Sequence, residues 1–338
     1  MWLVKSSTDQ ILTPTAIALG NFDGIHLGHQ KVISSIWTHS SLVAPPERSP
    51  VKDPKKIYSD CYSTVVTFNP HPREFFSGQK KQCLTPLAEK ILLLEQLGVE
   101  QLILLPFDQK LASLSPQAFV EEILVEKLQG RRVSVGADFR FGCQRTGGAE
   151  DLKAIASQFG IEVFITSLKT NFSADDPSEN LRISSSRIRQ ALAEGKIEDA
   201  NQMLGRPYTL TGTVVTGQKL GRTLGFPTAN LELPQDKLLP RFGVYAVRVE
   251  IKEHLLDTDS KTGFQGVINI GCRPTVAGES PTVEVHLLDW SGDLYGQCLI
   301  VSLEQFIRSE AKFPSLDALK AQIGADCELA RKILQVEM

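Results

Sequence analysis

The sequence of 338 residues has few cysteines and no long apolar run. Its six cysteines are scattered and include no C-x-x-C pair, which argues against a structural zinc site and a dense disulfide framework. No segment approaches the roughly 20 apolar residues of a membrane-spanning helix. The first residues also lack the basic and apolar stretches of a signal peptide. We therefore expect a cytoplasmic protein with no membrane partner.

Neither sign of charge is in large excess, and no repeat is evident. The formal net charge is −3, from 36 Lys and Arg against 39 Asp and Glu, so no broad basic surface predicts nucleic-acid binding. The length fits two domains better than one. Polar stretches at residues 44–60 and 170–182 predict exposed loops. Nothing in the sequence indicates an obligatory protein partner.

Strand-like and helix-like segments alternate over the first half of the chain. Strands are predicted at residues 15–19, 63–68, 101–105, 132–136 and 161–166, and helices at 29–38, 86–97, 116–128 and 148–159. This alternation predicts an α/β fold with a doubly wound parallel sheet and helices on both faces. Ligands of such sheets lie beyond the carboxyl ends of the strands. The loops after the first, second and fourth predicted strands should therefore converge.

The loop after the first strand contains the highest concentration of candidate catalytic and phosphate-binding groups. Residues 20–29 read Gly-Asn-Phe-Asp-Gly-Ile-His-Leu-Gly-His, which places His26 and His29 where a helix begins. A helix start offers unpaired N–H groups and partial positive charge, which suit a phosphate. Two imidazoles beside it can stabilise a phosphoryl group as its negative charge grows. The alternative is a glycine-rich turn with two surface histidines.

Three further segments of the first 190 residues carry candidate ligand-binding groups. Residues 69–72, Asn-Pro-His-Pro, follow the second strand, where the alternative is a rigid proline turn. Residues 136–142, Gly-Ala-Asp-Phe-Arg-Phe-Gly, follow the fourth, where the alternative is a loop that packs two phenylalanines. Residues 183–189, Ile-Ser-Ser-Ser-Arg-Ile-Arg, precede a predicted helix at 186–194. They could hold a triphosphate or serve as a plain helix cap.

After a helix pair at 186–204, the pattern changes to strands without helices between them. These strands are predicted at residues 208–216, 243–251, 264–270, 282–288 and 298–306. Within the fourth, apolar residues alternate with Thr282, Glu284 and His286, as in a strand with one buried face. We predict a compact antiparallel barrel. A helix at about 315–335 should pack on it through Leu316, Leu319, Ile323, Leu329 and Ile333.

One long loop of the second half could serve phosphate chemistry. Residues 217–231 read Gly-Gln-Lys-Leu-Gly-Arg-Thr-Leu-Gly-Phe-Pro-Thr-Ala-Asn-Leu. The glycines with Lys219 and Arg222 suit a flexible flap over phosphates, and the alternative is a long connection between barrel strands. Taken alone, Glu284 on the polar side of the fourth strand is an outward charge on an exposed strand face.

Taken together, these motifs resemble those of the bacterial bifunctional riboflavin kinase/FAD synthetases. Residues 20–29 are similar to G-x-F-D-G-x-H-x-G-H, the longer form of the nucleotidylyltransferase H-x-G-H signature. Residues 68–72, 136–142 and 183–189 resemble F-x-P-H-P, G-x-D-F-x-F-G and I-S-S-[ST]-x-I-R. In the second half, residues 225–230, 266–275 and 282–289 resemble G-x-P-T-A-N, the N-I-G-x-R-P-T segment and the strand that carries the kinase's catalytic glutamate.

The resemblance implies two activities and a domain plan. An FMN adenylyltransferase (nucleotidylyltransferase) domain would cover residues 1–186, connecting helices 187–204, and a barrel-shaped riboflavin kinase domain with a terminal helix 205–338. The kinase would phosphorylate riboflavin to FMN, and the adenylyltransferase would convert FMN to FAD with release of pyrophosphate. Both would use ATP with Mg²⁺.

The resemblance also implies roles for individual residues. In the adenylyltransferase, His26 and His29 would be catalytic. ATP would contact Gly20, Phe22, Asp23, Gly28, Ser184, Ser185, Ser186, Arg187 and Arg189, and the flavin would contact Asn69, Pro70, His71, Pro72, Asp138 and Phe139. In the kinase, Glu284 would be the catalytic base. ATP would contact Gly217, Lys219, Gly221, Arg222, Pro227, Thr228 and Asn230, with Thr228 and Asn230 as Mg²⁺ ligands and Asn269 and Arg308 on the flavin.

Two alternatives remain at this stage. The first half could act on a different substrate, because H-x-G-H proteins also make other nucleotide conjugates. The chain could instead be a flavin sensor in which one module has lost catalysis. The kinase motifs and the Pro-His-Pro loop argue against the first alternative. The presence of His26, His29, Thr228, Asn230 and Glu284 argues against the second.

Overall fold

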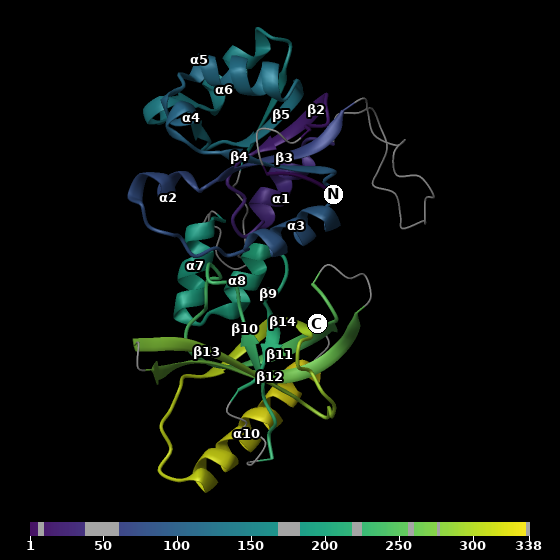
Figure 1. The fold of residues 1–338 in the computed structure, drawn as a ribbon, viewed down its shortest axis with the longest axis vertical. Helices are drawn as coiled ribbons and strands as arrows, with labels where there is room; N and C mark the ends of the chain where they lie inside the picture. Colours follow the sequence, from purple (N-terminus) through teal and green to yellow (C-terminus); the bar gives the residue numbers. More distant parts are fainter. Residues whose placement is uncertain are drawn as a thin grey trace, which may run out of the picture. The chain divides into compact units, whose positions relative to one another are not determined.

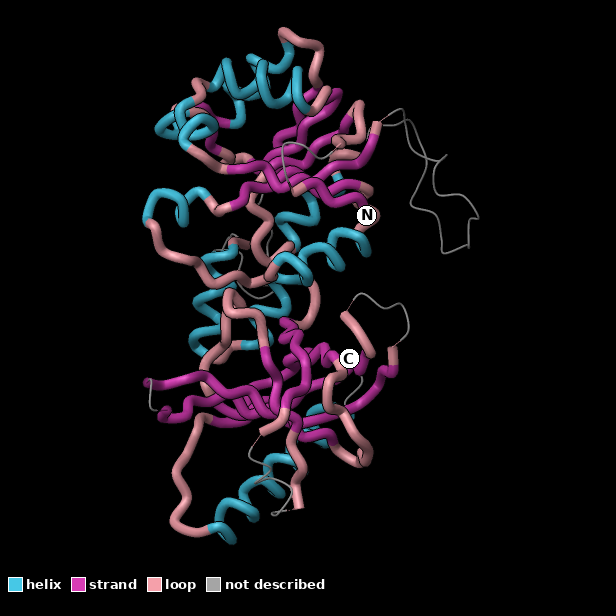
Figure 2. Tube along the Cα trace, viewed as in Figure 1, coloured by secondary structure: helices cyan, strands magenta, loops and turns pink. Residues whose placement is uncertain are grey.

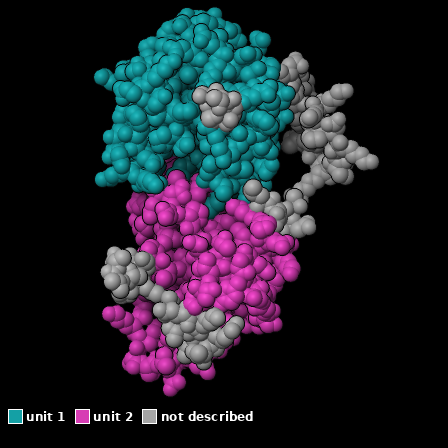
Figure 3. Space-filling model, in the orientation of Figure 1, with its two compact units in different colours: residues 1–81, 87–183 teal, residues 82–86, 184–338 magenta. Residues whose placement is uncertain are grey.

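A computed structural model describes residues 1–5, 10–37, 61–167, 183–217, 225–255, 260–275 and 278–335. The two predicted loops at 44–60 and 170–182 lie outside the described residues, as do Lys219, Gly221 and Arg222. The chain divides into two compact units. The first comprises Met1–Lys81 and Leu87–Ile183, and the second comprises Gln82–Pro86 and Ser184–Met338 (Figure 3).

A parallel sheet of six strands forms the centre of the first unit, in the order β1-β4-β3-β2-β5-β8 (Figure 1). The strands are β1 (Trp2–Val4), β2 (Thr15–Leu19), β3 (Tyr62–Asn69), β4 (Gln101–Pro106), β5 (Gly130–Gly136) and β8 (Glu162–Thr166). The five predicted strands are confirmed. The edge strand β1 was not predicted, because three residues are too few to show a period.

Helices cover both faces of this sheet. They are α1 (Leu27–Ser34), α2 (Pro72–Ser77), α3 (Leu87–Gln96), α4 (Gln109–Ser113), α5 (Pro116–Ala118), the π-helical η2 (Phe119–Lys127), the 3₁₀ turn η3 (Cys143–Arg145) and α6 (Ala149–Ser157). A small hairpin of β6 (Arg140–Phe141) and β7 (Gly147–Gly148) lies near α6. The helix predicted at 116–128 is therefore helical throughout, but it changes from α to π geometry at Phe119.

Strand β2 shows why the fold is doubly wound. Ile17 and Leu19 belong to a core beneath η2 and α6, whereas Ala16 and Ala18 belong to a second core beneath α1 and α3. Figure 1 shows these helices on opposite sides of the sheet. The strand is buried on both faces, as expected for a central parallel strand. This confirms the predicted arrangement.

The sheet order places three candidate loops beside one another. Strand β2 pairs with β3 on one side and with β5 on the other. All three strands run in the same direction, so their carboxyl ends lie at one edge. The loops that follow them, which begin at residues 20, 70 and 137, therefore leave from neighbouring positions. This confirms the predicted convergence.

A closed antiparallel barrel forms the body of the second unit, in the order β10-β13-β12-β11-β14-β9 (Figure 2). The strands are β9 (Tyr208–Val215), β10 (Ala229–Glu232), β11 (Gly243–Lys252), β12 (Lys261–Thr275), β13 (Gly278–Leu287) and β14 (Cys298–Arg308). The predicted barrel is confirmed. The prediction of one loop over 217–231 is corrected, because its last residues form β10. That short strand pairs with both β9 and β13 and closes the barrel.

Three helices of the described residues accompany the barrel. Helices α7 (Ser185–Glu194) and α8 (Ile197–Leu204) contribute buried residues to the same core cluster as the barrel strands. Helix α10 (Leu316–Gln335) packs on the outside through Cys327, Ala330 and Leu334. Its predicted docking is confirmed, but Leu316 and Leu329 are 68% and 44% exposed. The buried face includes small residues and a cysteine, which a search for large apolar side chains does not select.

Within the described ranges, no helix combines the length and apolar character that a membrane span requires.

Candidate functional sites

The two histidines of residues 20–29 form a stacked pair at the start of α1. His26 is the N-cap residue, and its Nδ1 accepts a hydrogen bond from the backbone N–H of His29 at 3.2 Å. The two rings stack with centroids 3.6 Å apart and planes 16° apart. The ring of Phe22 meets His29 edge-on at 5.3 Å. This packing holds both imidazoles beside the positive end of the helix.

The backbone before this pair adopts a conformation that most residues avoid. Phe22 and Ile25 have positive φ angles of 46° and 41°, as does Gly24 at 94°. A positive φ is a genuine outlier for a β-branched or bulky residue, and such outliers are concentrated at functional sites. Both side chains are 1% exposed and pack in the core beneath α1 and α3. Burial of these side chains therefore holds the turn in this conformation.

His29 is neutral in the ligand-free protein. Burial, and then the nearby His26 and Lys90, lower the pKa of His29 well below its ordinary value of 6.5. Its Nδ1 is buried and has no hydrogen-bond partner among the described residues. An unpartnered buried nitrogen is costly, so this atom suits contact with a polar ligand group. A neutral imidazole can supply one N–H donor to a phosphoryl oxygen.

Two lysines that sequence analysis did not select lie around the same loop. The Nζ atom of Lys90, on α3, donates to the backbone oxygen of Asn21 at 3.2 Å. The Nζ atom of Lys81 lies 3.6 Å from Oδ2 of Asp23, which is 7% exposed. Neither lysine belongs to a motif, so only the folded chain reveals their position. Together they add positive charge where a polyphosphate would bind.

Residues 69–72, which were predicted to contact the flavin, lead into a short helix that was not predicted. His71 is the N-cap of α2, and its Nδ1 accepts from the N–H of Arg73 at 3.1 Å. Burial lowers the pKa of His71 to about 4, with a further contribution from Lys81 that Asp23 partly offsets. His71 is therefore also neutral at pH 7.

The segment after β5 carries the polar residues Asp138 and Arg140 and two packed rings. Asp138 is exposed. Phe139 stacks on Phe141 at 5.7 Å between ring centroids, with planes 15° apart. The alternative of a loop that packs two phenylalanines is thus realised. Phe139 is partly buried against the core, and its role in flavin binding stays a prediction.

The serine motif begins α7 in the second unit, whereas the histidine pair lies in the first. Ser184 is the N-cap, and its Oγ accepts from the N–H of Arg187 at 3.3 Å. The guanidinium of Arg189 donates to the backbone oxygen of Gln82 at 2.7 Å. The helix cap is therefore present. Ser185 and Ser186 occupy the first turn, and the N–H groups at the start of a helix can also bind an anion.

Three predicted kinase residues form one row across neighbouring barrel strands. Glu284 of β13 lies directly opposite Asn230 of β10 on one side and Asn269 of β12 on the other. Directly opposed residues have Cβ atoms about 5 Å apart. All three are partly exposed. In the adjacent register position, Val285 and Ile268 are almost fully buried, so the row faces outward.

The row ends beside Gly217 on one side and at Arg308 on the other. A Cβ on Gly217 would collide with the side-chain amide of Asn230, so glycine at this position lets the amide approach the backbone. Toward α10, the row continues through Val244 to Arg308. The guanidinium of Arg308 makes a bidentate ion pair with the buried Asp326 of α10, at 2.7 Å for the shortest contact. Flavin contact by Arg308 stays a prediction.

We expect NMR titration of the imidazoles to show His71 still neutral at pH 5 and His29 with a pKa well below its ordinary value of 6.5. An unfolded chain binds a proton at each near pH 6.5, whereas the folded chain does not. Their contribution to stability is therefore complete above pH 6.5 and is lost as the pH falls below it, which for His71 extends to a pH of about 4. His71 is partly exposed, so we expect it to account for on the order of 1–2 kcal/mol.

His71→Asn is the matched variant for this titration, because asparagine also caps helices but does not titrate. The free energy of unfolding of this variant should fall less steeply between pH 6.5 and 4 than that of the wild type. Protonation of His71 near pH 6.5 in the folded protein would contradict the expectation.

Comparisons with known proteins agree with the division of the chain into two units. A riboflavin kinase family model matches residues 204–334, and an FAD synthetase model matches residues 8–177. The chain is 38% identical to a bifunctional riboflavin kinase/FMN adenylyltransferase of Haemophilus influenzae, over 96% of each chain. It is 39% identical to a protein of the same description from Escherichia coli K12, over 94% of this chain and 91% of that relative.

A solved structure from Streptococcus pneumoniae has a similar fold over nearly the whole chain. Its TM-score is 0.78 at 31% identity, covering 98% of this chain and 99% of the other. Its title describes a macrolide-efflux protein, a description that applies to that protein. The family models and the full-length curated relatives carry the assignment here. On their evidence, this chain belongs to the bifunctional riboflavin kinase/FMN adenylyltransferase family.

Proposed function

We propose that this chain converts riboflavin to FMN and FMN to FAD, with ATP as the donor in both steps. The observation that carries the proposal is that one chain contains both candidate active sites. A stacked histidine pair begins a helix beside a parallel sheet, and an Asn-Glu-Asn row lies on an antiparallel barrel. The matches to both family models support it. We assign adenylylation to residues 1–186, the connection to 187–204 and phosphorylation to 205–338.

In the adenylyl transfer, an oxygen of the FMN phosphate attacks the α-phosphorus of ATP. The new O–P bond forms as the bond between the α-phosphorus and its bridging oxygen to the β-phosphate breaks, and pyrophosphate leaves. No general base is needed, because the FMN phosphate is already ionised at neutral pH. Catalysis then rests on positioning and charge stabilisation. His26 and His29 stabilise the α-phosphoryl group, and the neutral His29 does so as a hydrogen-bond donor.

The remaining motif residues of this site would hold the substrates. We assign the β- and γ-phosphates to Ser184, Ser185, Ser186, Arg187 and Arg189, and the rest of ATP to Gly20, Phe22, Asp23 and Gly28. We assign the flavin to Asn69, Pro70, His71, Pro72, Asp138 and Phe139. The adjacent positions of β2, β3 and β5 support the part of this assignment that lies in the first unit.

In the kinase reaction, the riboflavin 5′-hydroxyl attacks the γ-phosphorus of ATP and ADP leaves. Glu284 accepts the hydroxyl proton as the new O–P bond forms, because an alcohol is a weak nucleophile without a base. Asn269 and Arg308 would contact the flavin. Gly217, Lys219, Gly221, Arg222 and Pro227 would surround ATP.

The donor set beside Glu284 fits a metal ion that arrives with ATP. Thr228 and Asn230 offer neutral oxygens and would hold Mg²⁺, which neutralises phosphate charge when bound. No cluster of three or more His, Cys, Asp or Glu suited to a metal occurs in the described part of the chain. Such a cluster is not needed when phosphate oxygens and water molecules provide the remaining ligands of the metal ion.

A cytoplasmic location is part of the proposal. No disulfide bond joins any of the six cysteines, all of which lie in the described part of the chain, and this supports a reducing compartment. Riboflavin, FMN, FAD and ATP are the partners that the two reactions require.

The direct test is turnover by the purified chain with riboflavin, ATP and magnesium, followed by chromatography of the flavins. We expect FMN to appear first and FAD second, with neither product formed when ATP is omitted. FMN without FAD would overturn the adenylyltransferase assignment. Tight flavin binding without any turnover would overturn both assignments and favour a sensor.

A further inference from the structure

His286 contacts the turn that leads into the proposed magnesium ligands. Strands β10 and β13 are paired next to this turn. The last cross-strand pair before the turn is Ala229 with Val285. The next residue of β13 is His286, and its Nδ1 lies 2.8 Å from the backbone oxygen of Pro227. A proline has no N–H to donate to a strand ladder. The imidazole therefore forms a hydrogen bond at the point where the backbone ladder stops.

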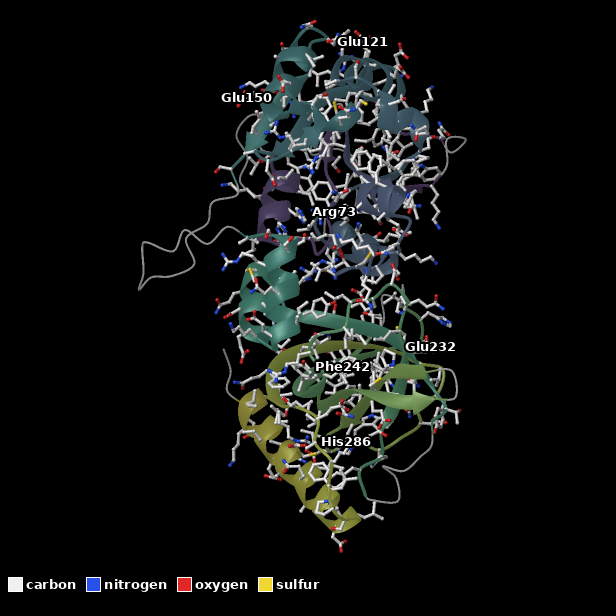
Figure 4. All side chains as sticks on the ribbon, turned by 90° about the vertical axis from the view of Figure 1, so that its left-hand side faces the viewer. Arg73, Glu121, Glu150, Glu232, Phe242 and His286 are labelled. Atoms are coloured by element: carbon white, nitrogen blue, oxygen red, sulfur yellow. The ribbon has the colours of Figure 1, made fainter. Side chains whose placement is uncertain are left out.

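A second contact holds the imidazole in place. The ring of Phe226 meets His286 edge-on, with centroids 5.5 Å apart and planes 82° apart. Phe226 in turn packs in the apolar cluster that α10 makes with the barrel. His286 is partly exposed on β13, where it is labelled in Figure 4. Its position is thus set by its own strand, by Phe226 and by the carbonyl of Pro227.

This arrangement bears on the metal ligands through the chain. Pro227 immediately precedes Thr228, and His286 lies two residues after Glu284 on the same face of β13. Mg²⁺ requires near-ideal octahedral geometry at 2.0–2.1 Å. A turn that is free to shift would misplace its oxygen ligands. Groups that orient metal ligands are typically worth 10–100-fold in affinity or activity.

We infer that His286 is a positioning residue for the kinase site. Its Nδ1–H donates to the carbonyl oxygen of Pro227 and holds Thr228 and Asn230 in the geometry that ATP-bound magnesium requires. His286 itself does not contact the phosphates or accept the substrate proton. The inference rests on the proposed kinase function, in which Thr228 and Asn230 are the ligands.

Two substitutions in the full-length protein separate positioning from other roles. In His286→Asn, the amide nitrogen occupies the place of Nδ1 and can still donate, whereas His286→Leu removes the donor. The first readout is amide hydrogen exchange in the ligand-free protein. We expect faster exchange of residues 225–232 in the leucine variant and near wild-type exchange in the asparagine variant. Exchange of residues 298–308, on β14, should not change in either.

The second readout is the kinetics of each reaction. We expect His286→Leu to raise the KM for magnesium-bound ATP in riboflavin phosphorylation about tenfold and to leave kcat within about twofold. His286→Asn should restore most of this loss. Conversion of supplied FMN to FAD should be unaffected in both variants.

Three results would overturn the inference. Unchanged exchange of residues 225–232 in the leucine variant would show that the contact does not order the turn. Faster exchange throughout the barrel would assign His286 to general stability. An equal fall in kcat for both variants, with KM unchanged, would make it a catalytic group. If the wild type formed no FMN, the proposed function would fail, whereas the exchange data would still test the contact.

Discussion

Glu284→Gln is expected to lower the rate of riboflavin phosphorylation by about 10²- to 10⁴-fold, the usual contribution of general acid–base catalysis. Glutamine preserves the size of the side chain but cannot accept the proton of the riboflavin hydroxyl. Glu284 lies between Asn230 and Asn269 in the outward row of the barrel, so a neutral side chain of equal size leaves the packing intact. The measurement is kcat/KM for FMN formation.

The same variant should convert supplied FMN to FAD at the wild-type rate, because the histidine pair lies in the other unit. Glu250→Gln is the matched control. Glu250 is also partly exposed on a barrel strand and pairs with Lys252 at 3.5 Å, away from the row. Phosphorylation that falls less than tenfold in Glu284→Gln would remove Glu284 from the role of base.

His29→Ala should produce the opposite result, with FAD formation lowered by about 10²- to 10³-fold and FMN formation retained. This is the usual cost of removing one donor that stabilises a transition-state charge. His29 stacks on His26 at the start of α1, and its Nδ1 is buried without a partner in the described chain. Alanine removes that donor without changing the helix cap, which His26 provides.

Lys31→Ala is the control for this variant, because Lys31 lies on the same helix and is exposed. FAD formation should be followed from supplied FMN and ATP, so that the kinase step does not limit it. Loss of both activities in a folded His29→Ala protein would contradict the assignment of the two reactions to separate sites. Retention of FAD formation would remove His29 from catalysis.

Sequence patterns predicted the fold well where the relevant signal was local. Alternating strands and helices were sufficient for the doubly wound sheet, and period-two alternation was sufficient for the outward position of Glu284 and the burial of Val285. The errors occurred in short elements such as β1 and β10. These strands are three and four residues long, and they form because neighbouring strands supply their hydrogen bonds. The neighbouring strands are distant in the sequence, so a short sequence window does not include them.

The helix on the barrel gives a similar lesson. Ile323 and Ile333 pack against the barrel as predicted, but Leu316 and Leu329 are exposed. The most deeply buried contacts of α10 are made by Cys327, Ala330 and Leu334. The face that a helix buries depends on the shape of the surface that it meets. The bidentate pair of Arg308 with Asp326 could not be predicted either, because the residues are 18 positions apart and come together only when α10 docks.

The sequence by itself therefore determined the two-part architecture, the histidine pair at a helix start, the outward Glu284 and, through its motifs, the family. These depend on residues that are close along the chain, where periodicity and capping act. Only the tertiary structure decided the left-handed backbone of Phe22 and Ile25, the lysines around Asp23 and Asn21, the Asn230–Glu284–Asn269 row and the contact of His286 with Pro227. Each of these depends on core packing or strand register, which join residues distant in the chain.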